Sequence, residues 1–521
     1  MKKHWVVLFV IVGLLFLAAC SKSTIPEGAE SADANSGSSG SEGAEQEIIY
    51  ASTSDAVGLS PTLTNDSVSS NVITQVYETL VERNPETMEL EPKLAESVEA
   101  TDELTWVFKL KDGIKFHDGT PLNAEAVKYS FEKLIDPATA APRASLLEPV
   151  DTITAVDDLT VEIKTKYPYG PMLAALSHVN ASIISPTADE NQDLMKDPVG
   201  TGPFKFVSWT TGDQVVLEKN EDYWGGAPEL DKVTFKVVPE ISTAISMLQT
   251  GEVNFLDALP TEQISRIESI ENIEVTKKEA TSMNYLTFNF SKERNQNPDF
   301  RKAIASAIDR DAFVEKLEGL GVRSDSILGP QVFGYDPALD KAGTAYDPEA
   351  AKKLVEENGF GDEPIKLLTA NRENFILMAE IVQSQLTEAG FNVEIEMLEW
   401  ATFLETARAG EFDMTFLSWA NVTSDGSEMF YPNFHSDNIG TSNRAQYNNA
   451  EFDKVVEESR TTIEPEEREK LLNEANKMML DDNAAIVMYH GMTTSATPNS
   501  VEGLKLDPNG IWYLNKVTNK Q

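Results

Sequence analysis

Cysteine is almost absent from this chain, because Cys20 is the only one among its 521 residues. The folded part of the protein therefore contains no disulfide, and its stability must come from buried apolar surface. The composition allows this, since 41% of the residues are hydrophobic and 8% are aromatic. Residues 47–521 suffice for roughly two or three cores of ordinary domain size.

Positive charge is scarce as well. The chain has 43 Lys and Arg against 85 Asp and Glu, a formal net charge of −42 at pH 7. Such a charge argues against binding to nucleic acid and against electrostatic adhesion to anionic lipid. The acidity is typical of a solvated surface adapted to salt or alkaline surroundings. After residue 20, no stretch approaches the roughly 18 consecutive apolar residues of a membrane-spanning helix.

The N-terminal residues show a short charged and apolar pattern. Lys2 and Lys3 precede an apolar run at residues 5–17, which is typical of a signal peptide. Residues 17–20, Leu-Ala-Ala-Cys, resemble the lipobox of bacterial lipoproteins. This resemblance implies that residues 1–19 are removed and that the Cys20 thiol carries acyl chains, such as palmitate, as a membrane anchor. The alternative is that Cys20 is a stray thiol in a signal peptide.

Residues 20–46 continue from this cysteine with mostly Ser, Gly, Ala and Glu. Such a segment cannot bury a core, so we expect a disordered linker with a reach of roughly 25–30 Å. The folded body is then expected on the extracytoplasmic face of the cell membrane, attached by lipid and close to a membrane partner.

From residue 47 onward, patterns of helices and strands alternate. Apolar residues at 68, 72, 73 and 76 recur at helical spacing, for example, and residues 104–110 alternate as in a half-buried strand. The predicted helices cover residues 68–81, 123–134, 241–248, 298–317, 348–358 and 373–389, and the predicted strands cover residues 48–52, 104–110, 215–217, 233–238, 253–256, 365–368, 391–398 and 412–419. This alternation predicts mixed α/β lobes.

Five segments carry a resemblance to a known family. They are LAESVEATDELTWVFKLKDGIKFHDGTPLNAEAVKYSFEKL at 94–134, DPVGTGPFKF at 197–206, NEDYW at 220–224, FRKAIASAIDRDAFVEKL at 300–317 and YDPEAAKKLVEENGF at 346–360. In this order they closely resemble the family 5 extracellular solute-binding proteins, which bind peptides, glutathione or nickel for ABC importers. The resemblance extends over residues 47–515.

The resemblance implies a two-lobed, periplasmic-binding-protein-like α/β fold of the class II type, with a hinge between the lobes and the ligand enclosed between them. The implied first lobe comprises residues 47–280 and 490–521 with an inserted subdomain at 82–185, the second lobe comprises residues 291–488, and the crossing strands are expected at 282–290 and 484–490.

The segment at 416–447 resembles the glutathione- and dipeptide-binding branch of this family. In that branch a loop led by a tryptophan carries an acid that receives the free amine of the ligand, and Trp419 fits this pattern. Ser427 stands where the acid is expected, with Asp425 and Glu428 on either side of it. Either acid could serve, or neither. Fine ligand specificity stays open for this reason.

Arginine is the residue best suited to a ligand carboxylate, because its guanidinium donates a bidentate fork. Arg372 lies between a predicted strand and a predicted helix, where loops face a cleft. Alternatively, Arg372 pairs at the surface with Glu373 or Glu380. Arg83 and Arg444 are weaker rivals.

The tryptophan candidates and the Thr201-Gly202 pair can also be explained by structural roles. Trp419 and Trp400 could stack on apolar groups of the ligand, or they could be ordinary core residues. For Thr201 and Gly202 a tight turn near the edge between the lobes is the expected role.

Three other functions compete with capture of short peptides or glutathione for an ABC transporter permease. A surface hydrolase would need a motif such as G-x-S-x-G or H-E-x-x-H, and the sequence has neither. A nickel-chelate receptor would need metal ligands, but the histidines are far apart without an i, i+4 pair, so no metal and no cofactor are expected. A peptide-sensing receptor would share the whole sequence. The histidines concerned are His117, His178, His435 and His490. We expect a monomer that is not an enzyme.

Overall fold

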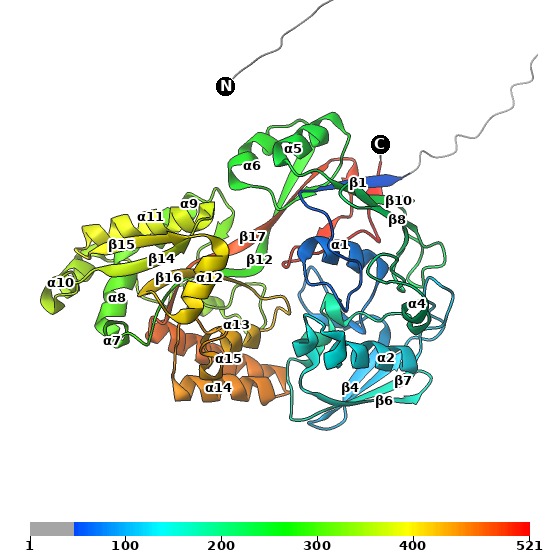
Figure 1. Ribbon diagram of the computed structural model, residues 1–521, viewed down its shortest axis with the longest axis horizontal. Helices are drawn as coiled ribbons and strands as arrows, with labels where there is room; N and C mark the ends of the chain where they lie inside the picture. The colour runs from blue at the N-terminus through cyan, green and yellow to red at the C-terminus, as the bar shows by residue number, and fades with distance from the viewer. Residues whose placement is uncertain (1–45, 521) are drawn as a thin grey trace, which may run out of the picture. The chain divides into compact units, whose positions relative to one another are not determined.

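The strands of this protein form three main sheets (Figure 1). The computed structural model describes residues 46–520. The predicted signal peptide, Cys20 and nearly all of the predicted linker lie outside the described residues. Within residues 46–520, no helix is both long enough and apolar enough to cross a bilayer.

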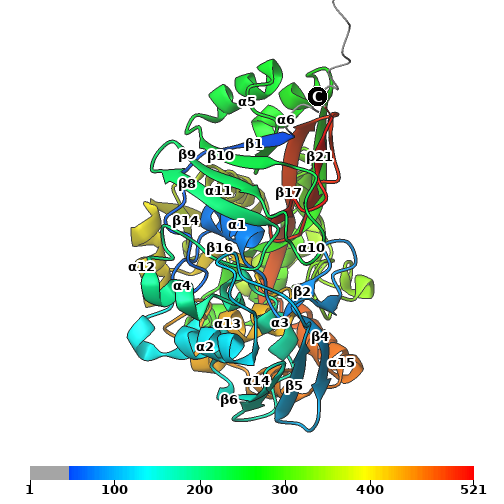
Figure 2. The same cartoon turned by 90° about the vertical axis from the view of Figure 1, so that its right-hand side faces the viewer.

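Two of the sheets have four strands, in the orders β1-β10-β9-β8 and β4-β5-β7-β6, and Figure 2 shows the first above the second. The third has the order β11-β17-β12-β16-β14-β15, with β13 paired to β17. The remaining strands pair as β2-β3, β18-β21 and β19-β20. The strands are β1 Glu47–Ser52, β2 Val81–Arg83, β3 Leu90–Pro92, β4 Ala95–Ala100, β5 Thr105–Leu110, β6 Val150–Asp157, β7 Thr160–Thr165, β8 Phe204–Thr210, β9 Gln214–Lys219, β10 Lys232–Val237, β11 Leu256–Asp257, β12 Ile273–Phe288, β13 Gly321–Val322, β14 Ile365–Ala370, β15 Val393–Leu398, β16 Met414–Ala420, β17 Ala485–Pro498, β18 Val501–Glu502, β19 Lys505–Leu506, β20 Trp512–Tyr513 and β21 Thr518–Asn519.

Helices alternate with these strands, which makes the fold mixed α/β as predicted. The α-helices are α1 Ser67–Val76, α2 Ala124–Ile135, α3 Met172–Leu176, α4 Pro186–Asn191, α5 Ile241–Thr250, α6 Thr261–Glu268, α7 Glu293–Gln296, α8 Pro298–Ala307, α9 Arg310–Glu315, α10 Pro348–Asn358, α11 Glu373–Glu388, α12 Trp400–Ala409, α13 Ser427–Phe434, α14 Ala450–Thr461 and α15 Pro465–Asp481. Short 3₁₀ helices lie at Pro137–Thr139, Ala144–Leu147, Val179–Ala181, Pro337–Leu339 and Ser436–Asn438.

Two long strands, β12 and β17, run between the group of helices α8–α15 and the region of α5 and α6 (Figure 1). They pair antiparallel from Ile273 opposite Pro498 to Thr287 opposite Ala485, with an irregularity between Glu279 and Met283. Both strands are longer than the segments 282–290 and 484–490 expected from the sequence. The two expected segments are neighbours in one sheet.

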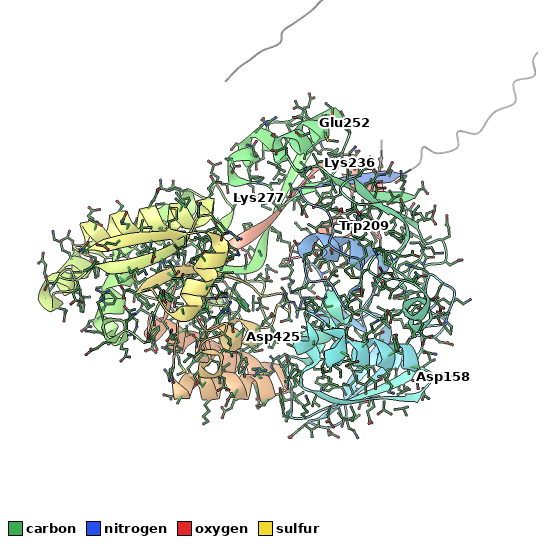
Figure 3. All side chains as sticks on the ribbon, in the orientation of Figure 1. Asp158, Trp209, Lys236, Glu252, Lys277 and Asp425 are labelled. Carbon is green, nitrogen blue, oxygen red and sulfur yellow. The ribbon has the colours of Figure 1, made fainter. Side chains whose placement is uncertain are left out.

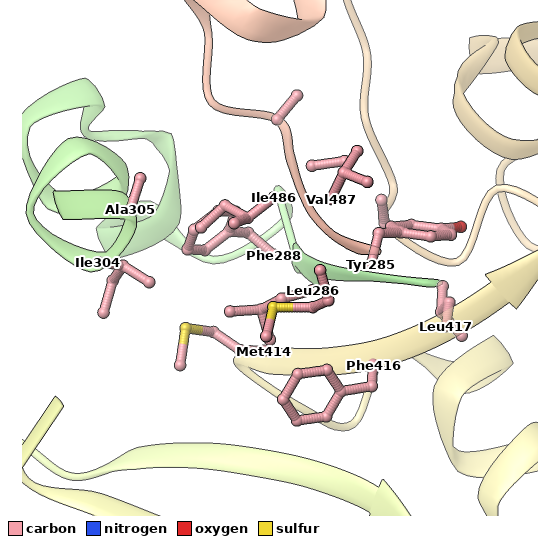
Figure 4. Close-up of a cluster of buried hydrophobic side chains, with 14 of the residues drawn as sticks. Tyr285, Leu286, Phe288, Ile304, Ala305, Met414, Phe416, Leu417, Ile486 and Val487 are labelled. Carbon is pink, nitrogen blue, oxygen red and sulfur yellow. The ribbon is translucent and has the colours of Figure 1, made fainter. Parts of the chain in front are cut away.

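The main core surrounds this third sheet (Figure 4). Residues 283–288 of β12 are all buried, so both faces of the strand are covered. This is the usual pattern for a central strand with helices on either side. Phe288 packs edge-on against Phe300 of α8, with ring centroids 6.4 Å apart.

Helix α1 begins as its sequence predicts and ends earlier. Asp66 is the N-cap, and its side chain accepts a hydrogen bond from Ser69 N. The helix predicted over 68–81 was wrong at its C-terminus, because the chain is extended from Tyr77 and Val81 belongs to β2. The Val76 carbonyl accepts a hydrogen bond from Gly202 N at 2.8 Å. A Cβ on Gly202 would lie 2.6 Å from Gln75 O, so glycine is required for this close approach.

The helix predicted over 298–317 is also corrected, since it divides into α8 and α9. Asp309 lies between the two helices, and its side chain accepts a hydrogen bond from Ala312 N as the N-cap of α9. A capping side chain that bonds to the backbone ahead of it starts a new helix. The strand expected at 253–256 is corrected as well, because β11 is Leu256–Asp257 and shares only Leu256 with it.

Candidate functional site

A cavity of about 290 Å³ lies where the segment after β16 meets the N-terminal half of the chain. Side chains from α1, the β2–β3 hairpin, the region of residues 177–182 and the C-terminal segment line most of it. Ala420 and Val422 contribute the lining from the β16 side. The cavity is therefore built from parts of the chain that are hundreds of residues apart.

Arg83 connects the two sides of this cavity. Its Nη1 donates to the Met88 carbonyl at 2.6 Å within the β2–β3 hairpin, and its Nη2 donates to the Thr423 carbonyl at 2.7 Å on the other side. Burial lowers the pKa of this guanidinium, although the carboxylates of Asp425 and Asp507 oppose that effect. Because the charge is buried, the two hydrogen bonds are strong constraints on the distance between the two sides.

Asn509 adds a second connection from the C-terminal segment. Its Nδ2 donates to Ser424 Oγ at 3.3 Å. The loop that carries Asn509 is held by Asp507, whose Oδ1 accepts hydrogen bonds from Asn509 N at 2.8 Å and Ile511 N at 3.0 Å. Burial raises the pKa of Asp507 to about 6.

Glu78 lines the cavity and is almost fully buried. Its carboxylate accepts hydrogen bonds from Thr201 Oγ1 at 2.8 Å, Tyr223 OH at 2.7 Å and Trp224 Nε1 at 2.8 Å. Lys93 Nζ lies 3.6 Å from the same group. Burial raises the pKa of Glu78 despite the Lys93 charge and these three hydrogen bonds. All of its oxygens are used, so Glu78 organises the cavity wall.

Two charged groups of the lining have capacity left for a ligand. Asp66 caps α1 through Oδ1, while its Oδ2 is buried without a hydrogen-bond partner among residues 46–520. Arg143 donates from Nε to Asn65 Oδ1 at 2.7 Å, and no carboxylate of the described residues lies within 4.0 Å of its guanidinium. A carboxylate and a guanidinium that lack an oppositely charged partner suit the ammonium and the carboxylate of a zwitterionic ligand.

The residues predicted from the sequence lie elsewhere. Arg372 is exposed, and its guanidinium carbon lies 3.5 Å from the centroid of the Trp400 ring. Trp400 in turn stacks on Phe403, with centroids 5.5 Å apart. The structure thus brings Arg372 and Trp400 together, as a cation–π pair.

The second predicted group lies along the segment after β16. Asp425, labelled in Figure 3, is buried and paired with Arg468, whose Nη2 lies 2.8 Å from Oδ1 and 2.9 Å from Oδ2. Glu428 accepts hydrogen bonds from the backbone N and the Oγ1 of Thr423 at 3.0 and 2.5 Å, and burial raises its pKa. Trp419 of β16 is half-buried opposite Met283 of β12.

None of these five residues, all of which the structure describes, lines the cavity. Their role in ligand binding stays a prediction. Of the two rival arginines, Arg83 lines the cavity and Arg444 does not. The sequence marks Asp66 or Ser67 as the cap of the helix that follows, and nothing in it singles out Arg143. The cap signal places Asp66 correctly, but no local pattern around Arg143 marks it.

Comparison with known proteins agrees with the family resemblance of the sequence. The family model of the bacterial extracellular solute-binding proteins, family 5 (middle), matches residues 89–441. The heme-binding protein A of Haemophilus influenzae is 28% identical, over 95% of this chain and 95% of the relative. The glutathione-binding protein GsiB of Escherichia coli O1:K1 / APEC is 29% identical, over 89% of this chain and 93% of the relative.

Solved structures show the same similarity. HbpA2 from Haemophilus parasuis has a TM-score of 0.85 at 26% identity and covers 91% of this chain and 100% of its own. The ABC transporter-associated periplasmic binding protein DppA from Helicobacter pylori, in complex with the peptide STSA, has a TM-score of 0.74 at 28% identity and covers 91% of this chain and 98% of its own. The fold of this chain is therefore the two-lobed fold of these binding proteins.

Proposed function

Because this chain belongs to the family 5 bacterial extracellular solute-binding proteins, we propose that it captures short peptides or glutathione and delivers them to the permease of an ABC transporter. The observation that carries the proposal is the cavity with Asp66 and Arg143 in its wall, each with unused capacity for an opposite charge. Its relatives are named as binding proteins for glutathione and heme, and one similar structure holds a peptide.

In this proposal the ligand lies between the lobes defined above. The first lobe comprises residues 47–280 and 490–521 with the inserted subdomain at 82–185, and the second comprises residues 291–488. The hydrogen bonds of Arg83 to the Thr423 carbonyl and of Asn509 to Ser424 then join the two lobes. Both bonds close the wall of the cavity, which supports a closed form as the ligand-binding form.

The size of the cavity favours a short ligand. A volume of about 290 Å³ is just below the roughly 300–1,000 Å³ that is usual for ligand pockets. A long peptide or a heme needs more room than this unless the lobes open further. Arg143 would receive the ligand carboxylate and Asp66 Oδ2 the ammonium, since Arg143 has no carboxylate within 4.0 Å among residues 46–520 and Asp66 Oδ2 has no hydrogen-bond partner there.

A thermal-shift panel tests this function. The full chain in detergent is heated with dipeptides, tripeptides, glutathione, nickel chelates and hemin. A ligand that binds only the folded form should stabilise it by about 2.7 kcal/mol at a hundredfold excess over its Kd. We expect a shift with a short peptide or with glutathione. A shift with nickel chelates or hemin alone would contradict the peptide proposal.

The same panel separates a binding protein from an enzyme. The relatives found by comparison are binding proteins, and we propose that this chain has no catalytic activity. Chromatography of the panel after incubation should therefore return every peptide intact. Cleavage of a peptide that also produces a thermal shift would instead support the surface hydrolase.

The anchor is part of the proposal as well. Family 5 proteins act outside the cytoplasm, and the lipobox-like residues 17–20 support attachment of this protein to the extracytoplasmic face of the cell membrane through acylated Cys20. A monomer tethered by a flexible linker would stay concentrated near its permease.

A further inference from the structure

A histidine and three carboxylates meet at the corner between α13 and α14, outside the cavity. His435 directly follows α13, and its side chain is 2% exposed. Its Nε2 lies 3.3 Å from Glu457 Oε1 and 4.0 Å from Asp453 Oδ1, and its Nδ1 lies 3.8 Å from Asp437 Oδ2. Asp453 and Glu457 are one turn apart on α14, so they share a face of that helix.

The Nε2 atom of His435 has no hydrogen-bond partner in residues 46–520, although it is buried. Buried polar atoms are nearly always bonded, so an orphan that faces two carboxylates requires an explanation. The ring is held in place on its other side, because Nδ1 accepts a hydrogen bond from Asp437 N at 3.2 Å. The free nitrogen is thereby directed at Asp453 and Glu457.

The charge of this cluster is not balanced by the protein. In the part of the chain that the structure describes, no Lys or Arg nitrogen lies within 4.0 Å of the carboxylates of Asp437, Asp453 or Glu457. Asp437 and Glu457 are 70% and 58% exposed, so water screens their charges, but Asp453 is only 13% exposed. A bound cation would relieve the repulsion between these groups.

We propose that His435, Asp453 and Glu457 bind a divalent transition-metal ion of the zinc class, which also includes cobalt and nickel. Ligand atoms about 2.1 Å from a tetrahedral zinc ion are about 3.4 Å from one another. The separation of 3.3 Å between His435 Nε2 and Glu457 Oε1 fits this geometry. Asp453 Oδ1 lies 4.0 Å from Nε2 and accepts a hydrogen bond from Ser436 N at 3.1 Å, so Asp453 would exchange this bond for the metal. An imidazole ligand favours these metals over calcium and magnesium.

Metal binding at Nε2 requires the neutral imidazole to carry its proton on Nδ1. The hydrogen bond from Asp437 N to Nδ1 is then lost, and Asp437 Oδ2, now 3.8 Å away, becomes the acceptor. A carboxylate that accepts the second N–H of a metal-binding histidine is the common arrangement in metal sites. Asp437 would thus position the ring while His435, Asp453 and Glu457 contact the metal, and water would complete the coordination.

The proposed metal site is separate from the ligand site, because none of these four residues lines the cavity. The site would fix the corner between α13 and α14. That corner lies next to a connection between distant parts of the chain, since the carbonyl of Arg460 on α14 accepts a hydrogen bond from Gly170 N at 2.8 Å.

Titration calorimetry of the full chain in detergent, after treatment with a chelator, tests the proposal with zinc chloride and nickel chloride as free salts. We expect one ion per chain, bound in the micromolar range or tighter. Glu457→Gln and Asp453→Asn should each weaken binding by roughly tenfold to a hundredfold. Glu458→Gln is the matched control on α14, because Glu458 faces Lys454 at 3.5 Å and not the cluster.

Cobalt supplies an independent readout. Its visible absorption bands should show imidazole and carboxylate coordination in the parent protein and should be lost in His435→Gln. If His435→Gln does not fold, Glu457→Gln gives the same test, because Glu457 is exposed and its substitution should not affect folding. Absence of binding, or equal binding by the parent and Glu457→Gln, would overturn the proposal. The peptide result of the thermal-shift panel tests the cavity and not this metal site, because the two sites share no residue.

Discussion

Arg468 holds Asp425 in a buried ion pair, with its Nη2 at 2.8 and 2.9 Å from the two carboxylate oxygens. Burial alone would raise the pKa of Asp425. The Arg468 charge and the hydrogen bonds from Ser427 outweigh that effect and hold the pKa below its usual value. The carboxylate is thus already matched by a positive charge in the folded protein.

Removing one member of this pair should be costly. We expect Arg468→Gln to lower the free energy of unfolding by about 3–5 kcal/mol, because it leaves an unpaired buried charge. Urea unfolding followed by circular dichroism measures this. Arg408→Gln is the control, since that arginine pairs with Glu405 at the surface and should change stability by about 0.5 kcal/mol or less. Equal effects of the two substitutions would contradict the prediction.

Asp507 predicts a pH dependence of stability. Its pKa is raised by burial to about 6 in the folded protein, compared with about 3.9 in the unfolded chain. Between these values the folded state keeps a proton that the unfolded state loses, so stability falls as the pH rises from about 4 to 6. Above pH 6 the whole cost of about 3 kcal/mol is present.

Asp507→Asn should remove this cost, because the amide oxygen can still accept the hydrogen bonds from Asn509 N and Ile511 N. We expect the variant to be more stable than the parent at neutral pH and equal to it near pH 4. Unfolding in urea at both pH values measures the difference. Asp158→Asn, at an exposed position, should show no such dependence.

Glu78→Gln should destabilise the cavity wall. The Oε2 atom of Glu78 accepts from Thr201 and Trp224, and its Oε1 accepts from Tyr223. An amide group must turn its NH₂ toward at least one of these donors. We expect a loss of about 1–3 kcal/mol in thermal unfolding for each donor left without an acceptor. Glu89→Gln, at an exposed position directly before β3, should melt like the parent.

Cys20→Ala tests the anchor. If Cys20 carries the lipid, the variant should leave the membrane fraction and melt at the same temperature as the parent, because Cys20 lies 27 positions before the first residue of β1, Glu47. Fractionation with a salt wash measures this. Persistence of Cys20→Ala in the washed membrane pellet would show that the lipoprotein prediction is wrong.

Calorimetry with the best ligand of the panel separates two possible binding sites. Arg143→Ala should weaken binding by roughly thirtyfold to several thousandfold, the equivalent of about 2–5 kcal/mol for a desolvated charge pair. Asp66→Asn should also weaken binding while it preserves the cap of α1, because asparagine is an equally good N-cap.

The comparison variants are Arg372→Ala, Asp425→Asn and Glu428→Gln. If these weaken binding more than Arg143→Ala does, the ligand lies against the residues predicted from the sequence and not in the cavity.

The fold could be predicted where the signal is local. Helix α10 begins after the Asp347 cap and ends before Gly359, and both signals are readable in the sequence. The predicted helix boundaries were wrong where contacts with distant residues or an internal cap determine them. The end of α1 depends on Gly202, more than a hundred residues away, and the break between α8 and α9 depends on a cap at Asp309 inside an apolar pattern.

The candidate site was harder to predict for the same reason. Asp425 was a reasonable candidate for a ligand amine, but its partner Arg468 lies 43 residues further on, with no pattern that links them. The cavity joins Asp66, Arg83, Arg143, Val422 and Asp507. Only the folded chain brings these five together, and the domain boundaries predicted from the sequence stay predictions.

The hydrogen bonds of Glu78 also bear on the order in which the protein folds. Trp224, one of its donors, is 146 residues further along the chain. At the usual speed of synthesis this segment follows on the order of ten seconds after Glu78. Until Thr201, 123 residues after Glu78, has been made, the carboxylate has none of its three donors and must stay hydrated. The packing around Glu78 therefore cannot be completed before residue 224 has been made, when less than half of the 521 residues have been synthesised.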